Sequence, residues 1–133
     1  MKIKPKIKTY GPIFARADGD GTLLYGYDRA AIDDPVPTSK TPAETLLASI
    51  AACMVLSVNI VAKQKNVQMN PFDVAVTATK AADLPSRFGV YEVRISAGLH
   101  DDPELAQSIA KQAKSACTIS NSVNGEIALI LDP

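Results

Sequence analysis

Hydrophobic and polar positions along this chain predict one long helix, a shorter helix and several strands. The longest apolar stretch covers residues 41–65 and reads TPAETLLASIAACMVLSVNIVAKQK. Thr41 is its predicted N-cap, with the hydroxyl accepting from a backbone N–H. Pro42 suits the first helical position, and Glu44 completes a capping box. Because the segment is apolar on almost every side, we expect a helix that is buried on every side at the centre of the fold.

The same stretch has a second interpretation, as a membrane span. Its apolar run is short, is rich in alanine and serine, and lacks a basic flank at its front. We therefore interpret it as a core helix, with Cys53 near its middle.

Alternating apolar and polar residues in other parts of the chain predict strands. The expected strands cover residues 2–9, 13–17, 22–27, 72–79, 92–99 and 126–131. Gly11-Pro12 is expected to separate the first two strands. The first strand carries a solvated face of lysines, and Pro5 is expected to keep it at a sheet edge. Residues 28–40 are expected to form a loop that leads into the long helix.

A second helix is predicted to begin at Pro103, with Asp102 as its N-cap. Four residues that fall every four positions form one stripe toward the core, namely Leu105, Ile109, Ala113 and Cys117. The order of elements predicts one α+β domain over residues 1–133. We expect antiparallel sheets around the long buried central helix, with the second helix beside it.

Charge and cysteine content exclude several classes of partner and site. The 14 basic and 14 acidic residues cancel, so we expect no nucleic-acid partner and no membrane partner. Two cysteines are too few for a disulfide scaffold and the N-terminus lacks the apolar segment of a secretory signal, so we expect a cytoplasmic protein. The single histidine, His100, is distant in sequence from both cysteines, and we expect neither a metal nor a bound cofactor.

The candidate chemistry depends on the two cysteines. Either one alone is well explained as a small buried hydrophobic residue. Cys53 lies on the long helix and Cys117 ends the second one, however, and two helices that share a core could bring the thiols together. A disulfide needs the two Cα atoms within about 7 Å, which sequence cannot supply.

Two motifs carry a resemblance to a known family. PAETLLASIAAC, which ends at Cys53, and CTISN, which begins at Cys117, resemble segments of the OsmC/Ohr family of organic hydroperoxide resistance and osmotically inducible proteins. The resemblance extends over nearly the whole chain, although many relatives have proline where this chain has Thr118. It implies an OsmC-like fold in an intertwined α+β homodimer and an antioxidant role in the oxidative stress response.

The resemblance also implies an activity, the reduction of organic hydroperoxides by a cysteine pair. Cys53 is then the peroxidatic thiolate and Cys117 the resolving thiol, and an external dithiol such as a lipoyl group re-reduces the pair. An arginine and a glutamate assist: Arg16 matches the expected place, Arg29 is the alternative, and Glu44 is the acid. A cation is needed because a thiol in apolar surroundings is otherwise protonated at neutral pH.

Glu44 has two interpretations, as a capping residue and as the acid that orients the arginine. In one straight helix Glu44 and Cys53 lie about 13 Å apart along the axis and on opposite sides, so they cannot meet within one subunit. If Glu44 serves a Cys53, that Cys53 belongs to another chain. In the peroxidases the acid directly follows the proline, where this chain has Ala43, and one position rotates a side chain by about 100°.

Two classes of function therefore remain open. One is a dithiol peroxidase that prefers alkyl or lipid-derived hydroperoxides. The other is a non-catalytic OsmC-like domain that binds an apolar small molecule at the dimer interface, with both cysteines structural. A hydrolase is a weaker interpretation, because Ser49 and Ser57 are explained as buried helix serines and His100 has no visible partner.

Overall fold

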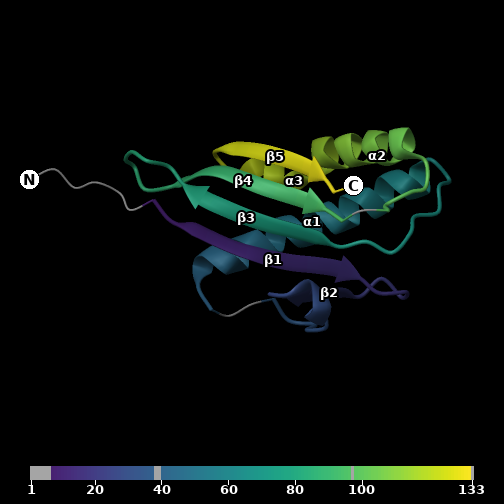
Figure 1. Cartoon of the computed structure of the whole chain (residues 1–133), viewed down its shortest axis with the longest axis horizontal. Coiled ribbons are helices and arrows are strands. Elements are labelled where there is room, and N and C mark those ends of the chain that lie inside the picture. The colour runs from purple at the N-terminus through teal and green to yellow at the C-terminus, as the bar shows by residue number, and fades with distance from the viewer. Residues whose placement is uncertain (1–6, 38–39, 97, 133) are drawn as a thin grey trace, which may run out of the picture.

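The computed structural model describes residues 7–37, 40–96 and 98–132, which form one five-stranded sheet with helices on one of its faces (Figure 1). The strands are β1 (Thr9–Ala17), β2 (Leu23–Gly26), β3 (Val74–Lys80), β4 (Phe88–Ile95) and β5 (Glu126–Leu131). The α-helices are α1 (Pro42–Gln64), α2 (Pro103–Ala116) and α3 (Thr118–Ser122), and a short 3-10 helix, η1 (Arg29–Ala31), follows β2. The predicted α+β class is confirmed.

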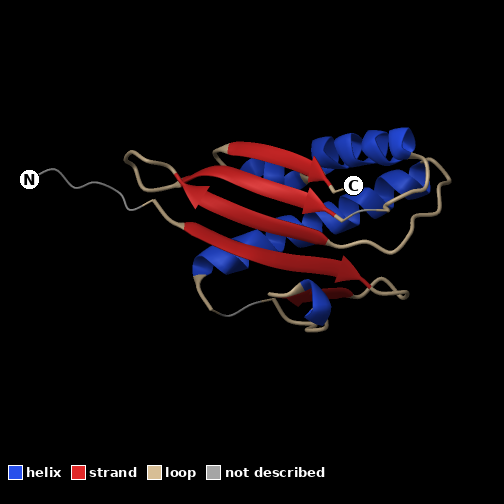
Figure 2. Ribbon diagram, in the orientation of Figure 1, coloured by secondary structure: helices blue, strands red, loops and turns tan. Residues whose placement is uncertain are grey.

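The strands are ordered β2-β1-β3-β4-β5, and Figure 2 shows the three α-helices behind them. β1 to β4 pair antiparallel, as predicted. β5 instead runs parallel to β4, with Val90 opposite Glu126, so the sheet is mixed. Parallel neighbours need a crossover connection between them. Here α2 and α3 form that connection, since they carry the chain back along the sheet before β5 begins.

β1 contains a bulge where the sequence predicted a break. Its pairing with β3 shifts between Tyr10 and Ile13, but the strand continues through Gly11. Gly11 has a φ of 94°, and a Cβ there would lie 2.6 Å from the backbone oxygen of Val76, so only glycine fits. The expected separation into two strands is therefore wrong.

The lysine-rich strand predicted over residues 2–9 lies largely outside the described residues. The description begins at Ile7, and Thr9 is the first residue of β1. The prediction of a lysine face at the sheet edge therefore stays a prediction.

The long central helix is confirmed by α1, although its cap differs from the predicted one. Thr41 occupies the N-cap position but its hydroxyl makes no cap hydrogen bond to the backbone. The hydroxyl donates instead to the carboxylate of Glu44. Pro42 is the first helical residue, as expected, and Glu44 places negative charge in the first turn.

One stripe of α1 faces solvent, which corrects the expectation that this helix is buried on every side. Ile50 and Met54 are fully buried against the sheet, whereas Leu56 is 43% exposed and Ile60 is 54% exposed. By length and composition α1 could cross a membrane, but 61% of its most apolar window is buried inside the fold, so this is weak support for a membrane span. The exposed stripe is apolar surface that a single chain leaves uncovered.

Strand alternation divides the sheet into two different faces. Side chains such as Val76 of β3 and Val93 of β4 are buried in the core under α1. The opposite face carries Phe14 and Ala75, which pack with Ile32 in a small second cluster. The main core therefore lies between the sheet and the helices, and this core contains both cysteines.

Candidate functional site

The two thiols lie side by side in the core. Cys53 is at the middle of α1, and Cys117 is the junction residue between α2 and α3. α1 contacts both of those helices, and the thiol of Cys53 is close enough to Cys117 to raise the pKa of the Cys117 thiol. Both cysteines are free. Packing of three helices thus joins two residues that are distant in the sequence.

The two cysteines differ in their access to solvent. Cys117 is fully buried, as are Ile109 and Ala113 of the same predicted stripe. Leu105 of the same stripe is partly buried and packs against the core. Cys53 is half-buried, because it lies on the side of α1 that carries the exposed stripe. A solute can therefore approach Cys53 more readily than Cys117.

The environment of Cys117 keeps its thiol protonated. Burial raises the pKa of this thiol from its usual value of 9.0, and the neighbouring Cys53 thiol raises it further. The Ser120 hydroxyl and backbone N–H act in the opposite direction and lower this pKa, because they stabilise a thiolate. Cys117 is thus suited to act after Cys53 and not as the first nucleophile.

Arg16 lies on the other side of the sheet from the thiols of its own chain. On β1, Ile13 and Ala15 are in the core under α1, and alternation points Arg16 to the opposite face with Phe14. Its Nε donates to the carbonyl of Ile32 at 2.8 Å. Among the described residues, Arg16 is the one arginine with no carboxylate partner in an ion pair.

The alternative arginine, Arg29, is neutralised by carboxylates. Its Nε lies 3.3 Å from Asp73, its guanidinium 3.9 Å from Asp132, and its Cζ lies 5.4 Å from the centre of the Phe14 ring. Arg94 also binds Asp132, at 2.8 Å. Within one chain, no arginine is placed beside Cys53 by any contact of the described residues.

Glu44 lies at the first turn of α1, away from Cys53, as the helix geometry predicted. Desolvation and then the negative charges of Glu44 and Asp34 raise the pKa of Tyr27. The carboxylate of Glu44 is therefore near the segment that follows β2. The structure brings the two cysteines together and leaves Arg16 and Glu44 separate from them.

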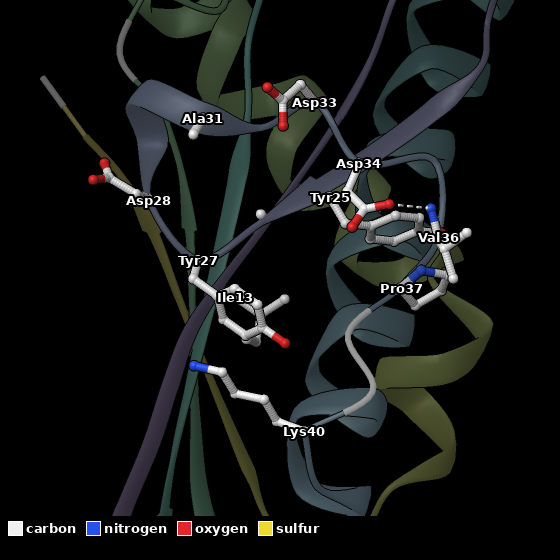
Figure 3. A pocket seen from close by; sticks show the side chains of 11 residues that line it. Ile13, Tyr25, Tyr27, Asp28, Ala31, Asp33, Asp34, Val36, Pro37 and Lys40 are labelled. Atoms are coloured by element: carbon white, nitrogen blue, oxygen red, sulfur yellow. Dashed lines mark hydrogen bonds between the residues drawn. The ribbon is translucent and has the colours of Figure 1, made fainter.

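That segment borders a hollow of about 540 Å³, shown in Figure 3. Apolar groups and two tyrosine rings contribute most of its lining, which comprises Ile13, Tyr25, Gly26, Tyr27, Asp28, Ala31, Asp33, Asp34, Val36, Pro37 and Lys40. The ammonium of Lys40 lies 4.2 Å from the centre of the Tyr27 ring. Sequence analysis missed this hollow because residues 28–40 were expected only to connect two elements, although the closely spaced tyrosines were a visible signal.

Nothing in the described ranges gathers three potential metal ligands at one place. His100, the single histidine, accepts a hydrogen bond through Nδ1 from the backbone N–H of Asp102 at 3.0 Å. Asp102 in turn caps α2, as predicted, by accepting from the backbone N–H groups of Glu104 and Leu105. These polar groups therefore serve the start of α2.

Comparison with known proteins agrees with this architecture. The crystal structure of the organic hydroperoxide resistance protein OhrB of Bacillus subtilis is similar, with a TM-score of 0.60, 20% identity, and 95% of this chain and 97% of that chain covered. An organic hydroperoxide resistance protein OsmC from Legionella pneumophila has a TM-score of 0.58 and 17% identity, with 98% of each chain covered. An OsmC-like protein of unknown function from Vibrio cholerae has a TM-score of 0.57 and 12% identity, and covers 98% of this chain and 99% of its own.

At these identities the structural likeness shows the fold alone. A search of curated proteins finds no match. The family model described as OsmC-like protein matches residues 37–132, which is more than half of the chain and includes both cysteine motifs. This chain therefore belongs to the OsmC-like protein family.

Proposed function

We propose that the protein reduces organic hydroperoxides through a dithiol–disulfide cycle of Cys53 and Cys117. The observation that carries this proposal is the contact between a half-buried thiol and a fully buried one in the same core. Two of the structures with this fold are named as organic hydroperoxide resistance proteins, which supports the same class of substrate.

The chemistry follows from the order of the two thiols. The Cys53 thiolate attacks the outer oxygen of the hydroperoxide, the O–O bond breaks, and an alcohol leaves while Cys53 becomes a sulfenic acid. The Cys117 thiol then condenses with it to a disulfide and releases water. A dithiol such as a lipoyl group supplies the two electrons that reopen the disulfide. The apolar surroundings favour alkyl or lipid-derived hydroperoxides over hydrogen peroxide.

The cation that ionises Cys53 comes, in this proposal, from a second copy of the chain. A homodimer is supported by the exposed apolar stripe of α1, which includes Leu56 and Ile60 and lies beside Cys53. Arg16 is the favoured arginine because its charge is not neutralised by a carboxylate, and Glu44 is the acid that orients it. Arg29 is the alternative, held by Asp73 and Asp132.

Counting thiols tests the proposed reaction. One equivalent of an organic hydroperoxide added to the reduced protein is expected to remove both free thiols of each chain and to form an internal disulfide. The Cys53→Ser variant is expected to keep its one remaining thiol, that of Cys117, whereas Cys117→Ser is expected to lose its one remaining thiol and to stop at the sulfenic acid. Retention of both thiols in the unmodified protein would overturn the proposal.

The oligomeric state tests the part played by a second copy. A Leu56→Lys substitution places a charge on the exposed stripe without entering the core, and a Gln107→Lys substitution on α2 is the matched control. Sedimentation is expected to show a dimer for the unmodified chain and for the control, and a folded, inactive monomer for Leu56→Lys. A fully active monomer would contradict the intersubunit site.

The hollow beside β2 favours a second candidate function, a domain that binds an apolar small molecule. Its volume and its mainly apolar lining are typical of ligand sites. In this case a fluorescent apolar probe is expected to bind the unmodified protein, and Tyr25→Ala to weaken that binding without changing the thiol count. Absence of probe binding together with loss of both thiols would favour the peroxidase.

A further inference from the structure

Ser120 is a buried hydroxyl whose place beside Cys117 is not explained by the cycle described above. Within the described part of the chain, the buried polar residues are Ser57 and Ser120, and Ser120 is only 3% exposed. Burying a hydroxyl costs free energy unless it makes hydrogen bonds. The hydrogen-bond partner of the Ser120 hydroxyl therefore indicates what this residue does.

The Ser120 hydroxyl donates to the carbonyl oxygen of Cys117 at 3.2 Å. The backbone N–H of Asn121 donates to the same carbonyl oxygen at 3.1 Å. A hydroxyl has a single proton and rotates about its C–O bond, whereas a carbonyl oxygen accepts two hydrogen bonds. If the Ser120 proton turns from the carbonyl to the Cys117 sulfur, Asn121 still satisfies the carbonyl. The Ser120 hydroxyl can therefore turn toward the sulfur when the sulfur becomes a thiolate, without leaving the carbonyl oxygen of Cys117 unsatisfied.

Burial decides which sulfur leaves when the disulfide is reduced. Cys117 is fully buried and Cys53 is half-buried, so an incoming dithiol reaches the disulfide at the Cys53 sulfur. A new S–S bond then forms between the reductant and Cys53, and the electron pair of the broken bond goes to Cys117. The second thiol of the reductant afterwards displaces Cys53 and closes a cyclic disulfide.

We propose that Ser120 is a positioning residue for reduction: its hydroxyl turns to the Cys117 sulfur and stabilises the thiolate that leaves when a dithiol attacks Cys53. This role rests on the proposed disulfide cycle, and it assigns Ser120 to the reductive half of that cycle. The contribution of the Ser120 hydroxyl and N–H to a lower pKa of Cys117 agrees with it. A thiolate formed in a buried apolar site otherwise lacks solvation.

The first test measures the Cys117 thiol alone. In a Cys53→Ala background Cys117 is the remaining cysteine, and NMR of isotope-labelled cysteine against pH gives its pKa. Adding Ser120→Ala is expected to raise that pKa by about one unit, the worth of one hydrogen bond to a charged group. Ser122→Ala is the matched control, since its hydroxyl donates to the Thr118 carbonyl in the same short helix and is exposed. An unchanged pKa in Ser120→Ala, or an equal rise in Ser122→Ala, would overturn the proposal.

The second test measures reduction without any hydroperoxide. The Cys53–Cys117 disulfide is formed with diamide, and its reduction by dithiothreitol is followed against pH. Ser120→Ala is expected to slow reduction about threefold, because a thiol of higher pKa leaves more slowly. Ser120→Thr, which keeps the hydroxyl, is expected to restore the rate. Equal slowing by Thr and Ala would show a packing effect and overturn the proposal.

These experiments separate the two proposals. If diamide forms the disulfide but a hydroperoxide does not, the peroxidase proposal fails while the Ser120 measurements stand. If the hydroperoxide oxidises both thiols and Ser120→Ala is reduced at the normal rate, the role of Ser120 fails alone.

Discussion

The face of the sheet that α1 covers and the face that it leaves open differ in both packing and chemistry. The covered face holds the main apolar core and both thiols. The open face carries Arg29 and Arg94 with their carboxylate partners, and it also carries Arg16. In the part of the chain that the structure describes, a thiol on the covered face thus has a neighbouring thiol but no arginine in contact with it. If the proposed cycle operates, one chain places the two thiols of the disulfide together, whereas the cation that activates Cys53 has to come from outside that chain.

The arginines of the open face provide the test with the largest expected effect. If Arg16 of a second copy ionises Cys53, Arg16→Met is expected to slow hydroperoxide reduction at least about tenfold, since losing a nearby cation shifts a thiol pKa by one unit or more. Arg87→Met is the control, because Arg87 pairs with Asp83 in the β3–β4 loop. Stopped-flow kinetics measures both rates. An unchanged rate for Arg16→Met with a slowed Arg29→Met would transfer the role to Arg29.

The packing of the covered face predicts the second largest effect, a loss of the free energy of unfolding when a buried side chain is shortened. Ile50→Ala, in the fully buried side of α1, is expected to lower the free energy of unfolding by about 2–5 kcal/mol. Ile60→Ala, on the exposed stripe of the same helix, is the matched control when both substitutions are made in the Leu56→Lys background, which is expected to be monomeric, and there it is expected to cost less than about 1 kcal/mol. Urea denaturation measures both. Similar losses at the two positions would show that the stripe is as buried as the core.

The protonation of Cys117 predicts a smaller effect, which depends on pH. Burial, which is the largest cause, and then the Cys53 thiol raise the pKa of Cys117 above its usual value of 9.0. The folded state therefore holds this proton more tightly than the unfolded state. Its contribution to stability is complete below pH 9.0 and is lost as the pH rises from there through the higher folded pKa.

Urea denaturation of the unmodified protein above pH 9.0 is expected to show this decline, and Cys117→Ala is expected to reduce its slope. Tyr25, Tyr27 and Tyr91, whose pKa values desolvation also raises, are retained in both proteins and contribute to the remaining slope. Identical slopes in the two proteins would mean that Cys117 ionises as readily in the folded chain as in the unfolded one.

The ion pairs of the open face predict the smallest effect. Arg94 lies 2.6 Å from Glu92 and 2.8 Å from Asp132, but its side chain is 43% exposed. Arg94→Met is therefore expected to lower the free energy of unfolding by about 1 kcal/mol or less, and the loss is expected to vanish at high salt. Thermal melts at two salt concentrations check this. A large loss that is independent of salt would show that this face is covered in solution.

Local patterns in the sequence determined much of the secondary structure. The long apolar run predicted α1, Asp102 and Pro103 predicted the start of α2, and the short apolar run over residues 126–131 predicted β5 where it lies. These signals depend on neighbours within one or two turns or along one strand, so they act before any packing. The candidate thiols were identified in the same way, from two short motifs.

Long-range packing decided the remaining features. The parallel pairing of β5, the exposed stripe of α1, the contact between Cys53 and Cys117 and the place of Arg16 on the far face all depend on segments distant in the chain. The sequence by itself determined which elements form and which side chains carry reactive groups, because periodicity and capping are local. Only the tertiary structure decided which of those groups meet, because one residue of strand register places a side chain on one face of the sheet or the other.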